Sequence, residues 1–418
     1  MGHEPEPEPD LQTDRRGFLQ AGAVAASATA IGFGATPADA QDAPAKAVVI
    51  PRRPLGKTGV DVTLLDIGTG RGKGIDRLLR YAFAQGIRAF DTSETYGSEG
   101  DFKKWFEALP EVRKQVFIVS KDAPKTPADL PAMVDNRLKA LGTDYIDLLF
   151  IHSFGDHHSL ADAVAMLKSR ELAQTVETIK KSGKVKLIGI STHHKDRAAL
   201  LQAAAEGGSV DAIMVQYNPW LDKESPLNKA LDACWNKGIG LISMKQFAGQ
   251  FLANSPKMNV LEEVVRRTPM LAEKKLTPFQ GLLHAIWSDE RIASACVSMG
   301  NIDQIRENAD AASRYEPLKA AEIRQLRDAS LAHGPILCAD CDGRCSKAAG
   351  TKAELGNLTR FLTYHEHHGD RVDARARYAA LGAEARDWSD ADLDAARLAC
   401  PNRLDFARLL PEVVRRLA

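Results

Sequence analysis

Four polar residues follow apolar runs that have the length and composition of β-strands. Asp91 ends the run AFD, Tyr96 lies in the loop behind it, Lys121 closes VFIVSK and His152 closes YIDLLFIH. In a β/α barrel, the carboxyl ends of the strands and the loops after them build the active site. We therefore expect a carboxylate, a phenol, an ammonium group and an imidazole to meet at one barrel mouth.

These four side chains together are suited to donating a proton. The ammonium group of Lys121 would lower the pKa of Tyr96, and Asp91 would keep Lys121 charged and oriented. His152 could orient a carbonyl substrate or share in the proton transfer. Each residue alone has an ordinary structural explanation, but the four in this order at strand ends indicate catalysis.

Eight apolar runs alternate with helical patterns, which predicts an α/β fold with a (β/α)8 barrel. A helix is also expected at residues 126–141, after a turn that contains proline. An open doubly wound sheet has less support, because GTGRGKG at 68–74 lacks the glycine spacing of a dinucleotide-binding turn. The expected strands are residues 62–68, 88–91, 116–121, 145–152, 185–192, 211–218, 240–245 and 293–300.

The motifs FDTSETYG, IVSK, YIDLLFIH and KLIGIST resemble the aldo-keto reductase family, over residues 52–312. The resemblance implies a TIM barrel whose bottom is plugged by a short hairpin at 51–62, with Gly59 in its turn. It also implies that NADPH or NADH is used to reduce a small-molecule carbonyl to an alcohol, or that the reverse oxidation occurs. Tyr96 would be the proton donor, and the hydride chemistry would belong to the cofactor.

The resemblance also assigns residues to the cofactor, and several of these positions carry unusual side chains. Met214 stands where the family has a glutamine, although Gln216 lies on the same strand face two residues later. Met244 replaces a ring-stacking aromatic residue, and a thioether can still pack on a flat ring. Ser298 and Gln304 replace basic residues, which leaves the choice between NADP and NAD open. The assigned positions are Ser191, Thr192, Gln216, Met244, Lys245, Ser298, Gln304, Glu307 and Asn308.

These departures from the family pattern support an alternative hypothesis of another class. In it, the cofactor site of the barrel has decayed, and the protein acts as a binding subunit or an iron–sulfur electron-transfer subunit. The complete set of Asp91, Tyr96, Lys121 and His152 opposes this alternative.

The first 40 residues resemble a twin-arginine signal peptide. Arg15 and Arg16 lie in DRRGFLQ, a weakly apolar stretch follows at 21–34, and Ala38-Asp39-Ala40 supplies small residues for cleavage. The pattern predicts that the twin-arginine export machinery delivers the folded protein to the periplasm. The expected domains are the signal peptide (1–40), a linker (41–51), the barrel (52–315) and a mainly helical C-terminal extension (316–418).

The overall composition excludes some partner classes. The 418 residues include 55 basic and 55 acidic side chains, so the formal charge is zero and a nucleic-acid partner is not expected. After the N-terminal region there is no apolar run of about 20 residues, so we expect no membrane span in the mature chain.

The C-terminal extension contains four of the six cysteines. Cys338, Cys341 and Cys345 form a C-x2-C-x3-C pattern, and Cys400 precedes a proline. Thiolates at such spacing hold iron–sulfur clusters or structural zinc, and a distant Cys-Pro is typical of ferredoxins. The extension resembles ferredoxin-like segments behind some aldo-keto reductase barrels, which implies a 4Fe–4S cluster ligated by all four cysteines. Zinc and disulfide bonds remain alternatives.

The two other cysteines, Cys234 and Cys296, lie in an apolar helix pattern and an apolar strand pattern. Free cysteine behaves as a small hydrophobic residue in such surroundings. We expect both to be buried and inert.

Overall fold

The fold is described from a computed structural model. The structure describes residues 48–70, 74–246, 260–331, 338, 341, 343–368 and 371–418. The chain divides into two compact units, residues 1–46 and 47–418, and all the described residues belong to the second. The predicted signal peptide and residues 71–73 of the GTGRGKG loop lie outside the described residues.

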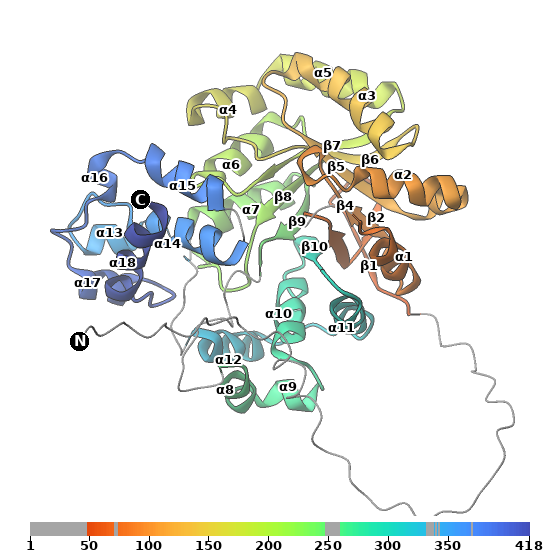
Figure 1. The fold of residues 1–418 in the computed structure, drawn as a ribbon. Helices are drawn as coiled ribbons and strands as arrows, with labels where there is room; N and C mark the ends of the chain where they lie inside the picture. The colour runs from red at the N-terminus through yellow and green to blue at the C-terminus, as the bar shows by residue number, and fades with distance from the viewer. Residues whose placement is uncertain are drawn as a thin grey trace, which may run out of the picture. The chain divides into compact units, whose positions relative to one another are not determined.

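Among the described residues, eight parallel strands close into a barrel in the order β10-β3-β4-β5-β6-β7-β8-β9. Helices surround this barrel, as Figure 1 shows. The predicted α/β fold and (β/α)8 barrel are therefore confirmed. The strands are β3 (Leu65–Gly68), β4 (Ala89–Asp91), β5 (Phe117–Asp122), β6 (Ile146–Ile151), β7 (Val185–Thr192), β8 (Ala212–Gln216), β9 (Gly240–Met244) and β10 (Ile292–Ser298).

Side chains along each barrel strand alternate between an inner and an outer hydrophobic core, because neighbouring residues of a strand face opposite sides. On β5, Val119 packs in the inner core and Ile118 in the outer core beneath the helices. On β8, Met214 packs inward and Val215 outward. The same parity turns Lys121 and Gln216 toward the interior at the carboxyl ends of these two strands.

An antiparallel hairpin of β1 (Arg52–Pro54) and β2 (Asp61–Thr63) lies outside the barrel sheet. Its Leu55 and Val62 belong to the inner core, so the hairpin plugs the barrel as expected. Gly59 has a φ of 78° in the turn. Gly56 also requires its glycine, since a Cβ there would lie 2.2 Å from the carbonyl oxygen of Gly238.

The strand predicted at 62–68 is wrong in its extent. The apolar run is divided, because Thr63 ends β2 of the hairpin and Leu65 begins β3 of the barrel. The hydroxyl of Thr63 donates to the carbonyl of Leu65, 2.9 Å away, across this change of sheet. A continuous apolar run does not show where the chain leaves one sheet for another.

Several helices of the barrel unit begin at polar or Pro-bearing turns. In the segment predicted as one helix at 126–141, Thr126 and Asp129 form a capping box on the 3-10 turn η4 (Pro127–Asp129), and α3 follows. The short 3-10 segments η2 (Glu94–Tyr96) and η3 (Pro110–Gln115) flank α2. The α-helices are α1 (Asp76–Ala84), α2 (Glu99–Ala108), α3 (Leu130–Leu141), α4 (Leu160–Leu167), α5 (Arg170–Lys181), α6 (Arg197–Gly207), α7 (Pro226–Asn236), α8 (Val260–Arg267), α9 (Pro269–Glu273), α10 (Pro278–Trp287), α11 (Ile302–Ser313) and α12 (Ala320–Leu331).

The C-terminal extension is helical, as expected, and has a hydrophobic core of its own. Leu358, Phe361, Phe406 and Leu410 pack in that core. Helix α12 instead packs Leu326 into the outer barrel core. The separate core of the extension therefore begins after α12 and not at residue 316. The extension forms the blue group in Figure 1, namely α13 (Arg344–Ala348), α14 (Leu355–Thr363), the π-helical segment η5 (Tyr364–His368), α15 (Arg371–Ala380), α16 (Ala383–Arg386), α17 (Leu393–Ala399) and α18 (Phe406–Leu417).

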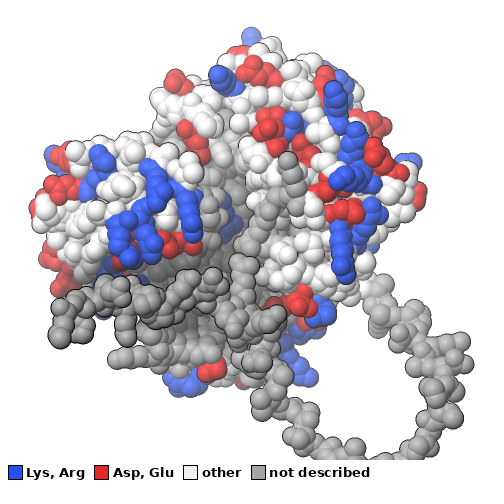
Figure 2. Space-filling model, viewed as in Figure 1, with Lys and Arg blue, Asp and Glu red and all other residues white. Residues whose placement is uncertain are grey.

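The surface carries both signs of charge. Basic and acidic side chains are interspersed on the face shown in Figure 2. Within the described ranges, none of the helices combines the length and the apolar character needed to cross a membrane.

Candidate active site

Three of the four predicted catalytic residues lie on, or directly after, neighbouring strands at the mouth of the barrel. Asp91 ends β4, Lys121 lies near the end of β5, and His152 follows β6. Tyr96 ends the 3-10 turn η2 behind β4 and is half-buried. The ammonium nitrogen of Lys121 lies 2.5 Å from both carboxylate oxygens of Asp91 and 5.0 Å from the ring centroid of Tyr96.

Lys121 is charged although it is almost fully buried, with 1 % of its surface exposed. Burial is the largest single effect and would lower the pKa of Lys121, but Asp91, with smaller contributions from Tyr96 and Cys296, raises the pKa above its ordinary value. The ammonium group also donates to the carbonyl oxygen of Thr92 at 3.0 Å. Asp91 therefore holds a permanent positive charge beside the phenol of Tyr96.

His152 is a neutral imidazole. Burial, followed by the positive charges of Lys121 and Lys245, lowers the pKa of His152 to about 3. Its Nδ1 lies 3.1 Å from the hydroxyl oxygen of Ser93, and its ring meets the Tyr96 ring edge-on with centroids 5.7 Å apart. A neutral imidazole can orient a carbonyl oxygen by a hydrogen bond, but it does not supply a proton as an acid near neutral pH.

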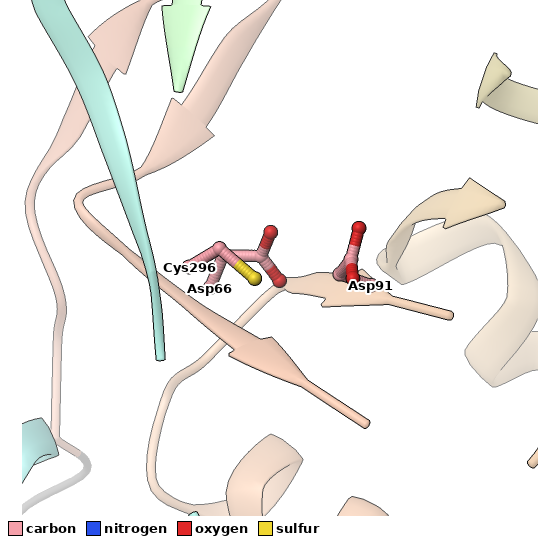
Figure 3. A group of neighbouring side chains, drawn as sticks. All are labelled: Asp66, Asp91 and Cys296. Atoms are coloured by element: carbon pink, nitrogen blue, oxygen red, sulfur yellow. The ribbon is translucent and has the colours of Figure 1, made fainter. Parts of the chain in front are cut away.

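Asp66 and Cys296 lie beside Asp91, and the sequence did not predict this group (Figure 3). One ligand atom from each of the three residues lies within 4.8 Å of the other two. Asp66 is fully buried on β3, and its hydrogen-bonding neighbour there is the thiol of Cys296. The signal that could have revealed it is an acidic residue inside the apolar run VTLLDIG.

Asp66 is neutral. Burial, and then the charge of Asp91, raises the pKa of Asp66 well above its usual range. Burial also raises the pKa of the Cys296 thiol, which therefore stays protonated. Since Lys121 already balances Asp91, the group does not need a metal ion to neutralise its charge. Cys296 was expected to be buried and inert; its thiol is protonated, but the residue is only partly buried and lies beside the catalytic carboxylate.

The residues assigned to the nicotinamide lie on three adjacent strands. Gln216 ends β8, Met244 ends β9, and both share the inward parity of Met214. Ser191 is also inward and buried near the end of β7. Thr192 faces the other way, because its hydroxyl donates to the carbonyl of Phe154 at 2.9 Å. Ser191, Gln216 and Met244 are therefore placed to line the mouth, whereas the Thr192 hydroxyl is not.

The residues assigned to the adenosine end lie around the start of α11. Ser298, at the end of β10, and Gln304 are exposed, and Gln304 accepts from the backbone N–H of Gly300 at 2.8 Å. Glu307 accepts from the Thr277 hydroxyl at 2.8 Å, which ties α11 to α10, and Asn308 is buried. None of the four residues assigned here is basic.

The C-terminal extension reaches the barrel mouth, which the sequence did not predict. The hydroxyl of Tyr364 lies 2.5 Å from the amide oxygen of Gln216 and 3.0 Å from the backbone oxygen of His193. Lys245 lies above the same ring, 5.2 Å from its centroid, and has the left-handed φ of 56° that side-chain-bearing residues seldom adopt. Backbone strain of this kind is often found at functional sites.

The four cysteines of the extension gather around the start of α14. Cys338 is partly exposed, and Cys341, Cys345 and Cys400 are buried. Burial, with the nearby Cys338 and Cys400, raises the pKa of Cys345 to about 11. A Cβ on Gly356 would lie 3.3 Å from the sulfur of Cys338 and 4.0 Å from that of Cys345. Cys341 belongs to the same group, since Cys338 and Cys345 also raise its pKa, after burial.

The comparisons with known proteins agree with the barrel fold. The family model described as "Aldo/keto reductase family" matches residues 75–330. An L-galactose dehydrogenase of Arabidopsis thaliana is 27% identical over 293 residues, which cover 64% of this chain and 89% of that protein. An L-glyceraldehyde 3-phosphate reductase of Escherichia coli K12 is 23% identical over 334 residues, 67% of this chain and 92% of that protein. A solved aldo-keto reductase from Bacillus halodurans, in its holo form, shares the fold with a TM-score of 0.53 at 19% identity, covering 67% of this chain and 96% of that chain.

Proposed function

The chain belongs to the aldo/keto reductase family, and from that premise we propose that it is an exported carbonyl reductase with Tyr96 as its proton donor. As a family member it is an NAD(P)-dependent oxidoreductase that acts on carbonyl or alcohol groups. The observation that carries the proposal is the buried pair of Lys121 and Asp91 beneath the Tyr96 ring.

The four residues of the mouth divide the work of carbonyl reduction. Tyr96 donates its proton to the carbonyl oxygen as that oxygen gains negative charge. Lys121 stabilises the resulting phenolate, and Asp91 keeps Lys121 in place and charged. Neutral His152 donates a hydrogen bond from its ring N–H to the carbonyl oxygen and so orients the carbonyl group.

A nicotinamide cofactor, when bound, supplies the hydride. The residues present fit its nicotinamide end, because Ser191 and Gln216 offer a hydroxyl and an amide for a carboxamide group, and Met244 offers a packing surface. They fit a 2′-phosphate poorly, because Ser298 and Gln304 carry no charge. We therefore expect the enzyme to discriminate weakly between NADPH and NADH.

Substitution of the proton donor tests the proposed reaction. Tyr96→Phe removes the hydroxyl but keeps the ring beside Lys121, so carbonyl reduction should fall by at least the roughly 10²-fold typical of losing a general acid. The measurement is the oxidation of NADPH with para-nitrobenzaldehyde as a general carbonyl probe, together with NADPH binding by fluorescence.

The control is Tyr81→Phe, which makes the same change in a half-buried tyrosine of α1, outside the site. It should keep the wild-type rate. If Tyr96→Phe turned over as fast as this control while binding NADPH equally well, Tyr96 would not be the proton donor.

We further propose that the extension carries a 4Fe–4S cluster. Four thiols converge there. The backbone N–H groups of Arg344, Ser346 and Leu404 form hydrogen bonds with the sulfurs of Cys341, Cys345 and Cys400 respectively, and these bonds oppose the rise in pKa that burial causes. Cys400 precedes Pro401, and a Cys-Pro ligand distant from the other cysteines is typical of ferredoxin clusters, so we place an iron–sulfur cluster before zinc.

The proposed cluster is also compatible with a second candidate function, electron transfer. A barrel that serves only as an iron–sulfur electron-transfer subunit would explain the converging thiols and the uncharged Ser298 and Gln304. It would not explain the Lys121–Asp91 pair beneath Tyr96, which is why we place the reductase first. The two differ in one measurable property, since only the reductase binds a nicotinamide cofactor.

A further inference from the structure

Tyr364 is a residue of the C-terminal extension that is buried at the mouth of the barrel. It begins η5, directly after α14, and none of its surface is exposed. Its hydroxyl is shared between the amide oxygen of Gln216 at 2.5 Å and the backbone oxygen of His193 at 3.0 Å. These partners lie 148 and 171 positions away in the sequence, so only the docked extension brings the phenol here.

The three barrel residues around Tyr364 follow three adjacent strands. His193 comes directly after β7, Gln216 ends β8, and Lys245 comes directly after β9. The ring of His193 meets that of Tyr364 edge-on, with centroids 5.5 Å apart, and the Lys245 ammonium lies 5.2 Å from the Tyr364 centroid. Tyr364 therefore covers the strand ends whose inward residues are suited to the nicotinamide end of the cofactor.

The hydrogen bond from Tyr364 also orients Gln216. Because the phenol donates to the amide oxygen, that side of the amide is occupied and its two N–H donors remain on the other side. Gln216 is 5 % exposed, so its amide has little freedom to turn. An amide held in this way presents donors to a carboxamide oxygen, while the Tyr364 ring adds an aromatic surface at the same strand ends.

Two ion pairs hold the extension over the same end of the barrel. Arg377 of α15 pairs with Asp156, in the loop after β6. Arg344 of α13 pairs with Asp222, in the loop after β8. The Arg377 and Asp156 side chains are only 12% and 11% exposed, so separating them would leave two poorly hydrated charges until the extension has lifted clear.

We propose that Tyr364 closes the nicotinamide end of the cofactor site, so that the docked extension retains the cofactor within the barrel. This inference rests on the proposed nicotinamide-dependent function. It gives the extension a role in the barrel's own site, besides holding a cluster. A retained cofactor would suit an enzyme exported to a compartment that does not supply free nicotinamide nucleotides.

Cofactor release tests the inference directly. The full-length protein is loaded with NADPH, and the loss of bound-nucleotide fluorescence is followed after mixing with excess NADP. Tyr364→Phe removes the bond to Gln216 and should speed release about threefold to tenfold. Arg377→Met removes an anchor outside the site and should also speed release, while the core of the extension stays intact.

The matched control is Tyr378→Phe, which makes the same change in a tyrosine buried within the extension on α15. It should release NADPH at the wild-type rate, and thermal unfolding should show that all three variants are folded. If Tyr364→Phe and Arg377→Met both released NADPH at the wild-type rate, the inference would be wrong. Tighter binding by Tyr364→Phe would also overturn it, because Tyr364 would then be obstructing the site.

The test separates this inference from the function on which it rests. A wild-type protein that bound neither NADPH nor NADH would overturn both. Wild-type binding with unchanged release in the two variants would overturn the role of Tyr364 and leave the reductase proposal standing.

Discussion

At the scale of single residues, the interior of the barrel mouth is organised by charge balance. Lys121 is the cation, Asp91 is its anion, and both are nearly inaccessible to water. A third ionised group would have no partner, and a buried unpaired charge is costly. Asp66 accordingly keeps its proton and His152 stays without one. The net charge around Tyr96 is therefore the same over a wide range of pH.

The neutral state of Asp66 predicts a specific dependence of stability on pH. The unfolded chain loses this proton above about pH 4, while the folded protein keeps it. The folded state then binds more protons, so the stability from Asp66 is fully present below about pH 4 and is lost as the pH rises toward the raised folded pKa. The Asp66→Asn variant cannot ionise at this position. As the pH rises, its free energy of unfolding should therefore increase relative to that of the wild type by up to about 1.4 kcal/mol per pH unit.

Urea unfolding of both proteins from about pH 5 to about pH 8 measures this difference. The contribution of His152, whose pKa is lowered, is common to both and cancels. Asp394→Asn, at an exposed position of α17, should follow the wild type throughout. A constant difference between Asp66→Asn and the wild type at all pH values would mean that Asp66 is ionised in the folded protein.

At the scale of elements, the inward parity of the strands places the site. Asp91, Lys121 and Gln216 are the last inward residues of β4, β5 and β8. Beneath them, the inner core requires small residues where strands approach closely. Gly189 on β7 is such a position, because a Cβ there would lie 1.9 Å from the carbonyl oxygen of Ala212 and 2.9 Å from the Phe150 ring.

Gly189→Ala should therefore destabilise the barrel. The added methyl group meets backbone that cannot move without breaking the sheet, and overpacking of this kind costs about 1–3 kcal/mol or more. Gly100→Ala is the opposite case, since it lies in α2 with nothing within 4 Å of a Cβ. It should stabilise the protein by about 0.5–1 kcal/mol. Thermal unfolding compares the two, and equal midpoints would contradict the close packing at β7.

At the scale of the whole molecule, the extension contacts the barrel mouth and also contains the group of four cysteines. Gly356 near the start of α14 faces the cysteines, and Tyr364 directly after that helix reaches the barrel mouth. They are eight positions apart along the helix, a rise of about 12 Å. One helix thus connects the proposed cluster to the proposed cofactor site.

Loss of one cysteine should remove the proposed cluster. Protein purified anaerobically should be brown and contain about four iron atoms and four sulfides per chain, and Cys400→Ser should lose much of both. Cys234→Ser, in the barrel helix α7, should keep the wild-type content. A colourless wild-type protein with one zinc would instead indicate a zinc site, and a metal-free protein would indicate disulfides.

The N-terminal arginine pair should control export. Changing Arg15 and Arg16 together to lysine should leave unprocessed protein in the cytoplasm, because the twin-arginine pathway reads this pair. The same change at Arg415 and Arg416, a partly exposed pair at the end of α18, should not affect delivery. Normal delivery of the first variant to the periplasm, as shown by cell fractionation, would exclude this export route.

The sequence by itself determined the barrel and the neighbourhood of Asp91, Lys121 and His152. Strand period and strand ends are local properties, and in a parallel barrel they turn inward residues toward one mouth. The tertiary structure decided what depends on distant contacts. The proton on Asp66 depends on its burial beside Asp91 and Lys121. The arrival of Tyr364 at Gln216 depends on the docking of a second core through ion pairs such as Arg377 with Asp156. Local patterning cannot predict these, because burial and charge state arise only when remote segments exclude water together.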